Sequence, residues 1–383
     1  MKVGFLVMNV GKNAGGPESY ERALLQQFSL QATNIEFHLY CFVPPTEFIR
    51  DLSRKNFVVH DLSSKNRFVS LAFQLPRLLK RHGIAFFHAP FVPPPFTSTP
   101  YLFTHHCFSP YVHPEFYDKA ILLRLRPLIS RGLNKAQHTL CVSENVRRLS
   151  AEELNIPYER MSVVHNGVDS FFQRVPKTEA KEYLESEYNL TSPFFFFAGK
   201  LQKRKNINRI LKSYRNFLDE TDSTIKFALA GSRTWASDDL DEMLRKYDLE
   251  SNVIELGYVP VDKLPYFYSA CEAFVFATLW EGFGIPLIEA MACGAPVIAS
   301  NLSSLPEIAD GAAYLVDPYS CDEIANAMKE ISRSPELKER LRNLGEQQAR
   351  KFSWERCARE TLEAYHEIFG LPISANESTK VAQ

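Results

Sequence analysis

The segment from Ala273 to Pro296 constrains the fold of this chain more than any other. It begins with a run of seven residues, AFVFATL (273–279), whose apolar and aromatic character predicts a buried strand. The glycine turn EGFGIP follows. The residues IPLIEAMAC (285–293) then predict a helix that ends at Gly294. A strand, a tight turn and a helix in this order are typical of parallel α/β sheets.

The turn has the chemistry of an anion site. Gly282 and Gly284 permit a tight backbone turn and let a ligand approach the amide groups closely. A helix that begins near Ile285 directs N–H groups and a partial positive charge at the turn, which favours a phosphate. Glu281 and Glu289 bracket the turn, and carboxylates beside a phosphate site usually accept hydrogen bonds from sugar or ribose hydroxyls. The alternative is a plain connection in which both carboxylates brace the backbone.

A second strand and helix place a cluster of cations at a strand end. The residues FFFFA (194–198) predict a buried strand, and GKLQKRKN (199–206) follows directly, before a helix predicted over 207–218. Four lysines and arginines packed into this loop, next to a helix N-terminus, favour phosphate binding. Strands alternate with helices in both halves of the 383 residues, which predicts two parallel, doubly wound sheets in two domains.

These segments resemble the retaining nucleotide-sugar glycosyltransferases of family 4, which have the GT-B fold and include bacterial enzymes of polysaccharide and lipopolysaccharide synthesis. The resemblance rests on three stretches. They are EGFGIPLIE (281–289), whose two glutamates have seven residues between them, AMACGAPVIAS (290–300) and LPEIADGAAYLVDP (305–318).

The resemblance implies two Rossmann-like domains that face each other across a cleft. We expect an acceptor-binding domain at 1–175 and a nucleotide-sugar domain at 176–351. The helix at 352–370 is expected to cross back and pack on the first domain. The residues 371–383 form a polar tail that we expect to be flexible.

The resemblance also assigns roles to the cations and to a histidine. Lys200 and Lys205 match the basic pair that neutralises the donor diphosphate, although lysine at the first position loses the bidentate fork of the more usual arginine. Lys203 and Arg204 are expected to face solvent. His105 follows the predicted strand 101–104 and matches the first position of a His–Asp pair near the donor sugar. The next residue here is a second histidine.

The remaining implied contacts lie along the donor. Glu281 is expected to contact the transferred sugar and, with Lys200, Lys205 and His105, to form the catalytic set, whereas Glu289 is expected to contact ribose. The implied donor-binding residues are Gly16, Gly199, Lys200, Lys205, Tyr258, Val259, Glu281, Gly282, Phe283, Gly284, Ile285, Leu287 and Glu289.

The mechanism that the resemblance implies is a same-face, ion-pair-like displacement that needs no single catalytic base. No aspartate pair of the metal-binding kind falls at the phosphate site, and Asp238–Asp239 lies in a predicted charged helix. We therefore expect no metal and no cofactor at the donor site, with the nucleotide sugar itself as substrate. We lean toward UDP-glucose or a related UDP-hexose as donor, followed by GDP-mannose. The acceptor is expected to be a glycan or a polyprenyl-linked oligosaccharide.

Charge is distributed unevenly along the chain. Residues 1–175 carry a net charge of +7 and the remainder −8. The helix predicted at 119–135 is basic and amphipathic, which favours either peripheral contact with an anionic membrane surface or a packed helix with solvated arginines. The first residues show no signal peptide, and no apolar run is long enough to span a bilayer. We expect a cytoplasmic protein with reduced thiols and no nucleic-acid partner, and the first of these alternatives would place it peripherally at the inner membrane face.

Other functions share parts of this pattern. A nucleotide-sugar epimerase would process the same donor without an acceptor. A non-catalytic nucleotide-sugar-binding protein would keep the lysines without needing Glu281. A dinucleotide dehydrogenase is disfavoured because the first glycine loop, Gly11–Gly16, lacks the GxGxxG spacing.

Overall fold

The computed structural model describes residues 1–12, 15–31, 35–42, 46–52, 56–62, 66–233 and 239–371. The chain divides into two compact units. Unit 1 comprises Met1–Gly167 together with the chain from Trp354 onward, and unit 2 comprises Val168–Ser353. The predicted boundary between the first two domains lay at residues 175 and 176, whereas the structure places it at Gly167 and Val168.

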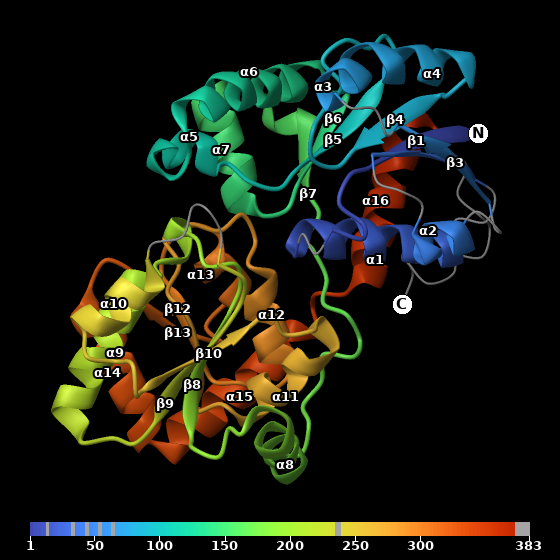
Figure 1. Ribbon diagram of the computed structural model, residues 1–383. Coiled ribbons are helices and arrows are strands. Elements are labelled where there is room, and N and C mark those ends of the chain that lie inside the picture. Colours follow the sequence, from blue (N-terminus) through green and yellow to red (C-terminus); the bar gives the residue numbers. More distant parts are fainter. Residues whose placement is uncertain are drawn as a thin grey trace. The chain divides into compact units, whose positions relative to one another are not determined.

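Unit 1 is built on a seven-stranded parallel sheet with the order β3-β2-β1-β4-β5-β6-β7 (Figure 1). Its strands are β1 (Lys2–Val7), β2 (Glu36–Cys41), β3 (Phe57–Asp61), β4 (Phe86–Ala89), β5 (Tyr101–His105), β6 (His138–Cys141) and β7 (Met161–Val163). Its α-helices are α1 (Gly16–Gln31), α2 (Glu47–Leu52), α3 (Arg67–Val69), α4 (Leu75–Arg81), α5 (Ser109–Val112), α6 (Lys119–Lys135), α7 (Glu144–Leu154) and α16 (Trp354–Phe369).

Unit 2 repeats this plan with a six-stranded parallel sheet in the order β10-β9-β8-β11-β12-β13. Its strands are β8 (Phe194–Ala198), β9 (Lys226–Ala230), β10 (Val253–Gly257), β11 (Ala273–Phe276), β12 (Val297–Ser300) and β13 (Tyr314–Val316). Its α-helices are α8 (Lys177–Tyr188), α9 (Ile207–Thr221), α10 (Leu240–Lys246), α11 (Leu264–Ala270), α12 (Ile285–Ala292), α13 (Leu305–Ala309), α14 (Cys321–Arg333) and α15 (Pro335–Ala349).

Both sheets follow the doubly wound strand order, which confirms the predicted α/β class. In such sheets the chain starts near the middle, runs to one edge and returns to build the other half, so helices cover both faces. In unit 2, α9 packs with α10 and α14, while α11 packs with α8 and α12. The strand order reverses between β8 and β11, and this is the switch point at which open α/β sheets bind ligands, beyond the carboxyl ends of the strands.

Helix α16 belongs to unit 1 although it comes last in the sequence. Its Tyr365 is fully buried and its hydroxyl lies 2.5 Å from Nδ1 of His88 on β4. The other ring nitrogen of His88 lies 2.7 Å from Oγ1 of Thr104 on β5, which in turn lies 3.1 Å from the hydroxyl of Tyr20 on α1. Each of these four buried side chains thus has a hydrogen-bond partner, and the chain of hydrogen bonds fixes α16 against the sheet and α1.

Proline separates two helices and is accommodated inside a third. Pro335 pushes Ser334 into an extended conformation between α14 and α15, and Ser334 then caps α15 by accepting a hydrogen bond from the amide of Leu337. Conversely, α6 is continuous through Pro127. Pro127 costs the carbonyl of Leu123 its partner, and Leu123 is 77% exposed, so water can solvate that carbonyl.

Several strand and helix ends also shift. The strand predicted over 273–279 ends at Phe276, as β11, so residues 277–284 form an irregular connection before α12. Of the predicted helical pair Asp238–Asp239, the first residue lies outside the described part of the chain. Asp239 precedes α10 and caps it by accepting a hydrogen bond from the amide of Glu242.

Candidate active site

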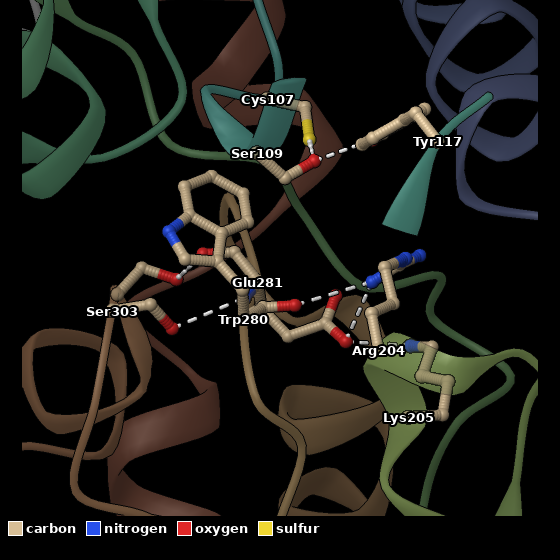
Figure 2. A network of polar contacts seen from close by, with 9 residues as sticks. Cys107, Ser109, Tyr117, Arg204, Lys205, Trp280, Glu281 and Ser303 are labelled. Atoms are coloured by element: carbon tan, nitrogen blue, oxygen red, sulfur yellow. Dashed lines mark hydrogen bonds and ion pairs between the residues drawn. The ribbon is translucent and has the colours of Figure 1, made fainter. Parts of the chain in front are cut away.

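The candidate site lies at the switch point of unit 2. The basic loop 199–206 leaves the carboxyl end of β8, and the connection 277–284 leaves the neighbouring strand β11. Because the carboxyl ends of parallel strands share one edge of the sheet, the two loops meet there. Figure 2 shows the polar contacts that join them.

At the centre of the site, one carboxylate is paired with two cations. One carboxylate oxygen of Glu281, Oε1, accepts hydrogen bonds from Nζ of Lys205 at 2.7 Å and from Nη1 of Arg204 at 2.9 Å (Figure 2). Glu281 and Lys205 are buried, and Arg204 is half-buried. The Lys205 ammonium also lies 4.7 Å from the centre of the Phe276 ring, a cation–π contact.

These contacts keep Glu281 ionised despite its burial. Burial alone would raise the pKa of the carboxyl, but the charges of Arg204 and Lys205 outweigh it and hold the pKa below its ordinary value. The two cations and one carboxylate leave a net positive charge at the loop, before any ligand is counted. That balance suits an anion such as a diphosphate.

The backbone around Glu281 is held on both sides. Its amide donates to Oγ of Ser303 at 3.1 Å, and its carbonyl accepts from Oγ of Ser304 at 3.1 Å. Arg204 donates a further hydrogen bond to the carbonyl of Trp280 at 3.3 Å. Asn206 ties the loops together because its side-chain amide donates to the carbonyls of Ala277, at 2.9 Å, and Pro318, at 2.7 Å. The carboxylate is therefore positioned by the fold and needs no ligand to hold it.

The turn after Glu281 requires glycine at one position. Gly284 has φ of +96°, in the left-handed region, and a Cβ there would lie 2.6 Å from Cδ2 of Leu305. Helix α12 begins at the next residue, Ile285, so its first-turn N–H groups point toward the loop. Gly282, Phe283 and Leu287 are buried around this turn. The predicted strand, turn and helix are all present.

Glu289 lies one turn further along α12 in a different environment. It is buried, and its Oε2 accepts a hydrogen bond from the hydroxyl of Tyr268 at 3.2 Å. Burial raises the pKa of Glu289 to about 8, and the charge of Asp169 adds to this shift, although Tyr268 and Lys205 oppose it. Glu289 is thus mostly protonated at neutral pH, whereas Glu281 is ionised.

The other predicted donor residues in unit 2 lie at the same edge of the sheet. Lys200 is exposed, Tyr258 is 55% exposed, and Val259 is buried, in the loops after β8 and β10. Gly199 touches the loop after β9, because a Cβ on Gly231 would lie 1.9 Å from the carbonyl oxygen of Gly199. Lys200 is therefore a surface cation, and Lys205 is the buried one.

One prediction about this loop was wrong. Arg204 was expected to face solvent, but its side chain is half-buried and pairs with Glu281. Sequence reasoning missed it because a run of cations identifies a basic loop without telling which members point inward. Here residues 203–205 form a single 3-10 turn, which turns Arg204 and Lys205 toward Glu281 and leaves Lys203 exposed.

The predicted residues of unit 1 have their own contacts. His105 ends β5, and its ring nitrogens lie 3.0 Å from Oγ of Ser150 and 3.0 Å from the carbonyl oxygen of Cys107. Burial lowers the pKa of His105 to about 4, so the ring is neutral and both nitrogens are engaged within the unit. This arrangement suits a positioning role better than proton transfer. Gly16 is the first residue of α1, at the end of the first glycine loop, of which residues 13 and 14 lie outside the described ranges.

Comparison with known proteins identifies the chain. The family profile "Glycosyltransferase Family 4" matches residues 14–170, and the profile "Glycosyl transferases group 1" matches residues 180–348. The chain is 31% identical, over 262 residues, to the O-antigen chain mannosyltransferase B of Escherichia coli, a match that covers 68% of this chain and 69% of that protein. This chain belongs to the glycosyltransferases.

Further similarities agree with this assignment. The glycosyltransferase is 28% identical over 240 residues to the O-antigen chain mannosyltransferase RfbU of Salmonella typhimurium, covering 63% of each chain. The solved sucrose-phosphate synthase of Thermosynechococcus elongatus superposes with a TM-score of 0.78 at 18% identity, covering 97% of this chain and 99% of that one. The fold is therefore of the GT-B type, which confirms the family predicted from the sequence.

None of the helices in the described part of this glycosyltransferase is long and apolar enough to cross a lipid bilayer.

Proposed function

We propose that this glycosyltransferase transfers a mannosyl group from GDP-mannose to a glycan or polyprenyl-linked acceptor of O-antigen type, with retention of the anomeric configuration and without a metal at the donor site. The observation that carries the proposal is the buried group of Glu281, Arg204 and Lys205 beside the glycine turn of α12. Sequence analysis alone favoured UDP-glucose. The donor proposed here is GDP-mannose instead because mannosyltransferases are among the relatives, including the two described above.

The two cations would hold the donor diphosphate. An ammonium carries three N–H donors and a guanidinium five, so Lys205 and Arg204 can each contact Glu281 and a phosphate oxygen together. The first-turn amides of α12 add a partial positive charge at the same place. As the bond between sugar and phosphate lengthens, negative charge grows on the leaving diphosphate. Fixed positive groups in a buried site stabilise that charge more than water does.

Glu281 would act on the sugar. A carboxylate that is ionised and held on both sides of its backbone can accept a hydrogen bond from a sugar hydroxyl. It also favours the positive character that the sugar ring gains in the transition state. Glu289, one turn along α12, would contact the ribose of the nucleotide. The proposed roles thus follow the order of the donor from sugar to nucleoside.

The donor and the reaction class are tested together. The protein is mixed with labelled GDP-mannose, UDP-glucose and related UDP-hexoses, with and without a polyprenyl-linked oligosaccharide, and the product's anomeric configuration is determined by NMR. We expect acceptor-dependent transfer from GDP-mannose with retention. Transfer from a UDP-hexose alone would refute the mannosyl assignment, and inversion would refute the mechanism. Conversion of the donor without acceptor would indicate an epimerase, and tight binding without turnover a binding protein.

We also propose that unit 1 contacts an anionic membrane surface, where a lipid-linked acceptor would be found. Helix α6 is basic and exposes Leu123. Phe96, 52% exposed, lies 6.0 Å from the ring of Phe73 and 5.7 Å below the guanidinium of Arg131 on α6. Exposed aromatic rings next to arginines are suited to the interface between lipid headgroups and acyl chains.

Vesicle flotation tests this contact. The protein should float with anionic vesicles at low salt and be released at high salt, with each basic residue near the surface contributing about 1 kcal/mol. The double variant Phe73→Ser, Phe96→Ser should float less, because it keeps the charge but loses the apolar contacts. Equal flotation with neutral and anionic vesicles would refute the electrostatic contact, and no flotation with either would favour a soluble acceptor.

A further inference from the structure

Three histidines meet at the outer edge of the unit 1 sheet, a feature that the proposed function does not use. They are His38 on β2, His60 on β3 and His82, which caps the end of α4. Each offers one ring nitrogen, and these three atoms all lie within 4.8 Å of one another. His38 is buried, whereas His60 and His82 are half-buried, so the group is open to solvent on one side.

The sheet register explains why the histidines gather. His38 and Tyr40 are two residues apart on β2, so their side chains point to the same face. His60 is the register partner of Tyr40 on the neighbouring parallel strand, which places its side chain on that face as well. Helix α4 ends at Arg81, and His82 follows over the same face, where the Tyr40 hydroxyl lies 3.0 Å from its Nδ1.

The contact with Glu36 orients the His38 ring. Nε2 of His38 lies 2.8 Å from Oε1 of Glu36, and an ionised carboxylate can only accept, so this nitrogen carries the proton. Nδ1 is therefore the nitrogen of His38 that is placed to bind an ion, and it lies 2.8 Å from Nε2 of His60. Lys2 lies 3.5 Å from the same oxygen of Glu36 at the surface. A histidine oriented by a carboxylate through its second nitrogen is the usual arrangement of a metal ligand.

We propose that His38, His60 and His82 bind one divalent transition metal ion, with Zn²⁺ as the best fit and a fourth position left to water. Imidazole nitrogen suits zinc, copper and nickel, and three histidines with an open position is a known zinc arrangement. Nitrogens bound to one tetrahedral zinc at ~2.0–2.1 Å lie roughly 3.3 Å apart. The distances of 2.8 Å between His38 and His60 and up to 4.8 Å across the group bracket that separation.

The stacked rings show what binding must change. The rings of His60 and His82 stack with centroids 4.2 Å apart, and those of His38 and His60 are 5.0 Å apart. Rings that share an ion turn their nitrogens toward it, so these side chains must rotate while the backbone stays in place. A bound ion would then link β2 and the edge strand β3 to the end of α4. Sequence analysis expected no metal and missed the group because spacings of 22 residues between its members match no ligand motif.

Metal titration of the full chain tests the proposal. The protein is stripped with chelator and dialysed, then titrated with Zn²⁺ by calorimetry and with Co²⁺ by visible absorption. We expect one equivalent of ion and a higher midpoint of thermal unfolding in its presence. His60→Ala and His82→Ala should lose this equivalent. His138→Ala is the matched control because His138 is half-buried in the same unit and bonded to Ser162, away from the group, so it should bind as the wild type does.

A second variant keeps the test decisive if a histidine variant fails to fold. Glu36→Gln changes an exposed side chain that orients His38 without binding the ion, so affinity should fall about 10- to 100-fold. Failure of the wild type to bind one equivalent would overturn the proposal. So would unchanged affinity in both His60→Ala and Glu36→Gln, which would indicate an ion held elsewhere. All these readouts are independent of sugar transfer.

Discussion

The two ends of the segment 281–289 bury a carboxylate each, and the fold treats them in opposite ways. Glu281 lies in the loop before α12 and meets two cations, which hold its pKa below the ordinary value against the effect of burial. Glu289 lies inside the helix and meets the hydroxyl of Tyr268, so burial prevails and its pKa rises to about 8. The same residue type is therefore an anion at one end and mostly a neutral acid at the other.

We relate this difference to two roles, in which Glu281 acts in the chemical step and Glu289 acts in donor binding. An ionised carboxylate in a buried site is costly unless it is paired, and Arg204 and Lys205 supply the pair for Glu281. In the proposed mechanism the negative charge of Glu281 stabilises the transition state, which offsets this cost. Glu289 is assigned to ribose hydroxyls, which do not change during the reaction, so its carboxyl needs its charge only when the donor binds and not for the transition state. The predictions that follow test this division, beginning with the largest expected effect.

Glu281→Gln should lower kcat by roughly two decades, which corresponds to ~3 kcal/mol of lost transition-state stabilisation. The substitution keeps the shape of the side chain and removes the charge that favours a positive sugar ring. Affinity for the free nucleotide diphosphate should stay near that of the wild type. Steady-state rates at saturating donor, with calorimetric affinities, measure both. Turnover at the wild-type rate would remove the distinction between the two carboxylates.

A control for this variant is available on the surface of the same unit. Glu220→Gln removes a carboxylate that pairs with Lys329 on exposed faces of α9 and α14, so neither rate nor affinity should change. Glu281→Gln also leaves Lys205 without its buried partner. Its far-UV spectrum and unfolding midpoint must therefore be compared with the wild type before the rate is interpreted.

Lys205→Ala should weaken binding of the nucleotide diphosphate by about one to two decades. A buried charge-assisted hydrogen bond typically contributes ~1.5–3 kcal/mol, and Lys205 is the buried cation of the loop. Lys200→Ala should have a smaller effect because Lys200 is exposed. Lys203→Ala, in the same loop and also exposed, is the control. Calorimetry that gave wild-type affinity for both the 205 and 200 variants would show that the phosphates bind elsewhere.

Some features of the site could be predicted from the sequence and others could not, because only some of them depend on local chemistry. The glycine turn, the strand before it and the helix after it were predictable because each follows from local chemistry, as Gly284 at positive φ illustrates. The pairing of Arg204 with Glu281 was not, because it joins residues 77 positions apart and depends on how a single 3-10 turn points three cations. The opposite pKa shifts of the two glutamates depend on the same long-range contacts.

Donor binding should strengthen with pH through Glu289. If the ribose hydroxyls bind the ionised carboxylate, binding lowers a pKa of about 8, so affinity should rise by up to about tenfold between pH 7 and pH 9. Glu289→Gln should show weaker binding of both nucleotide and nucleotide sugar, with no such rise. Calorimetry in buffers of different ionisation enthalpy should detect the released proton in the wild type. An identical pH profile in the variant would assign the titration to another group.

The raised pKa of Glu289 also makes the stability of the fold depend on pH. The folded-state pKa lies above the ordinary value of 4.5, so the stabilising contribution of the protonated form is present below that value and is lost as pH rises through about 8. The unfolding midpoint of Glu289→Gln, relative to the wild type, should therefore increase with pH over this window. A difference that did not vary with pH would mean that Glu289 stays ionised.

The smallest expected effect is that of a chelator on sugar transfer, and it follows from both carboxylates together. A divalent cation at the diphosphate would need an anionic oxygen ligand from the protein. Glu281 already shares its Oε1 with Arg204 and Lys205, and Glu289 is mostly protonated at neutral pH, so neither is suited to that task. In the proposed mechanism the two cations supply the neutralising charge instead. Initial rates should therefore be unchanged in excess chelator, and the His60→Ala variant should behave in the same way because the histidine group lies in unit 1. Loss of transfer in chelator, restored by Mn²⁺ or Mg²⁺ but not by Zn²⁺, would show that the charges around Glu281 rearrange when the donor binds.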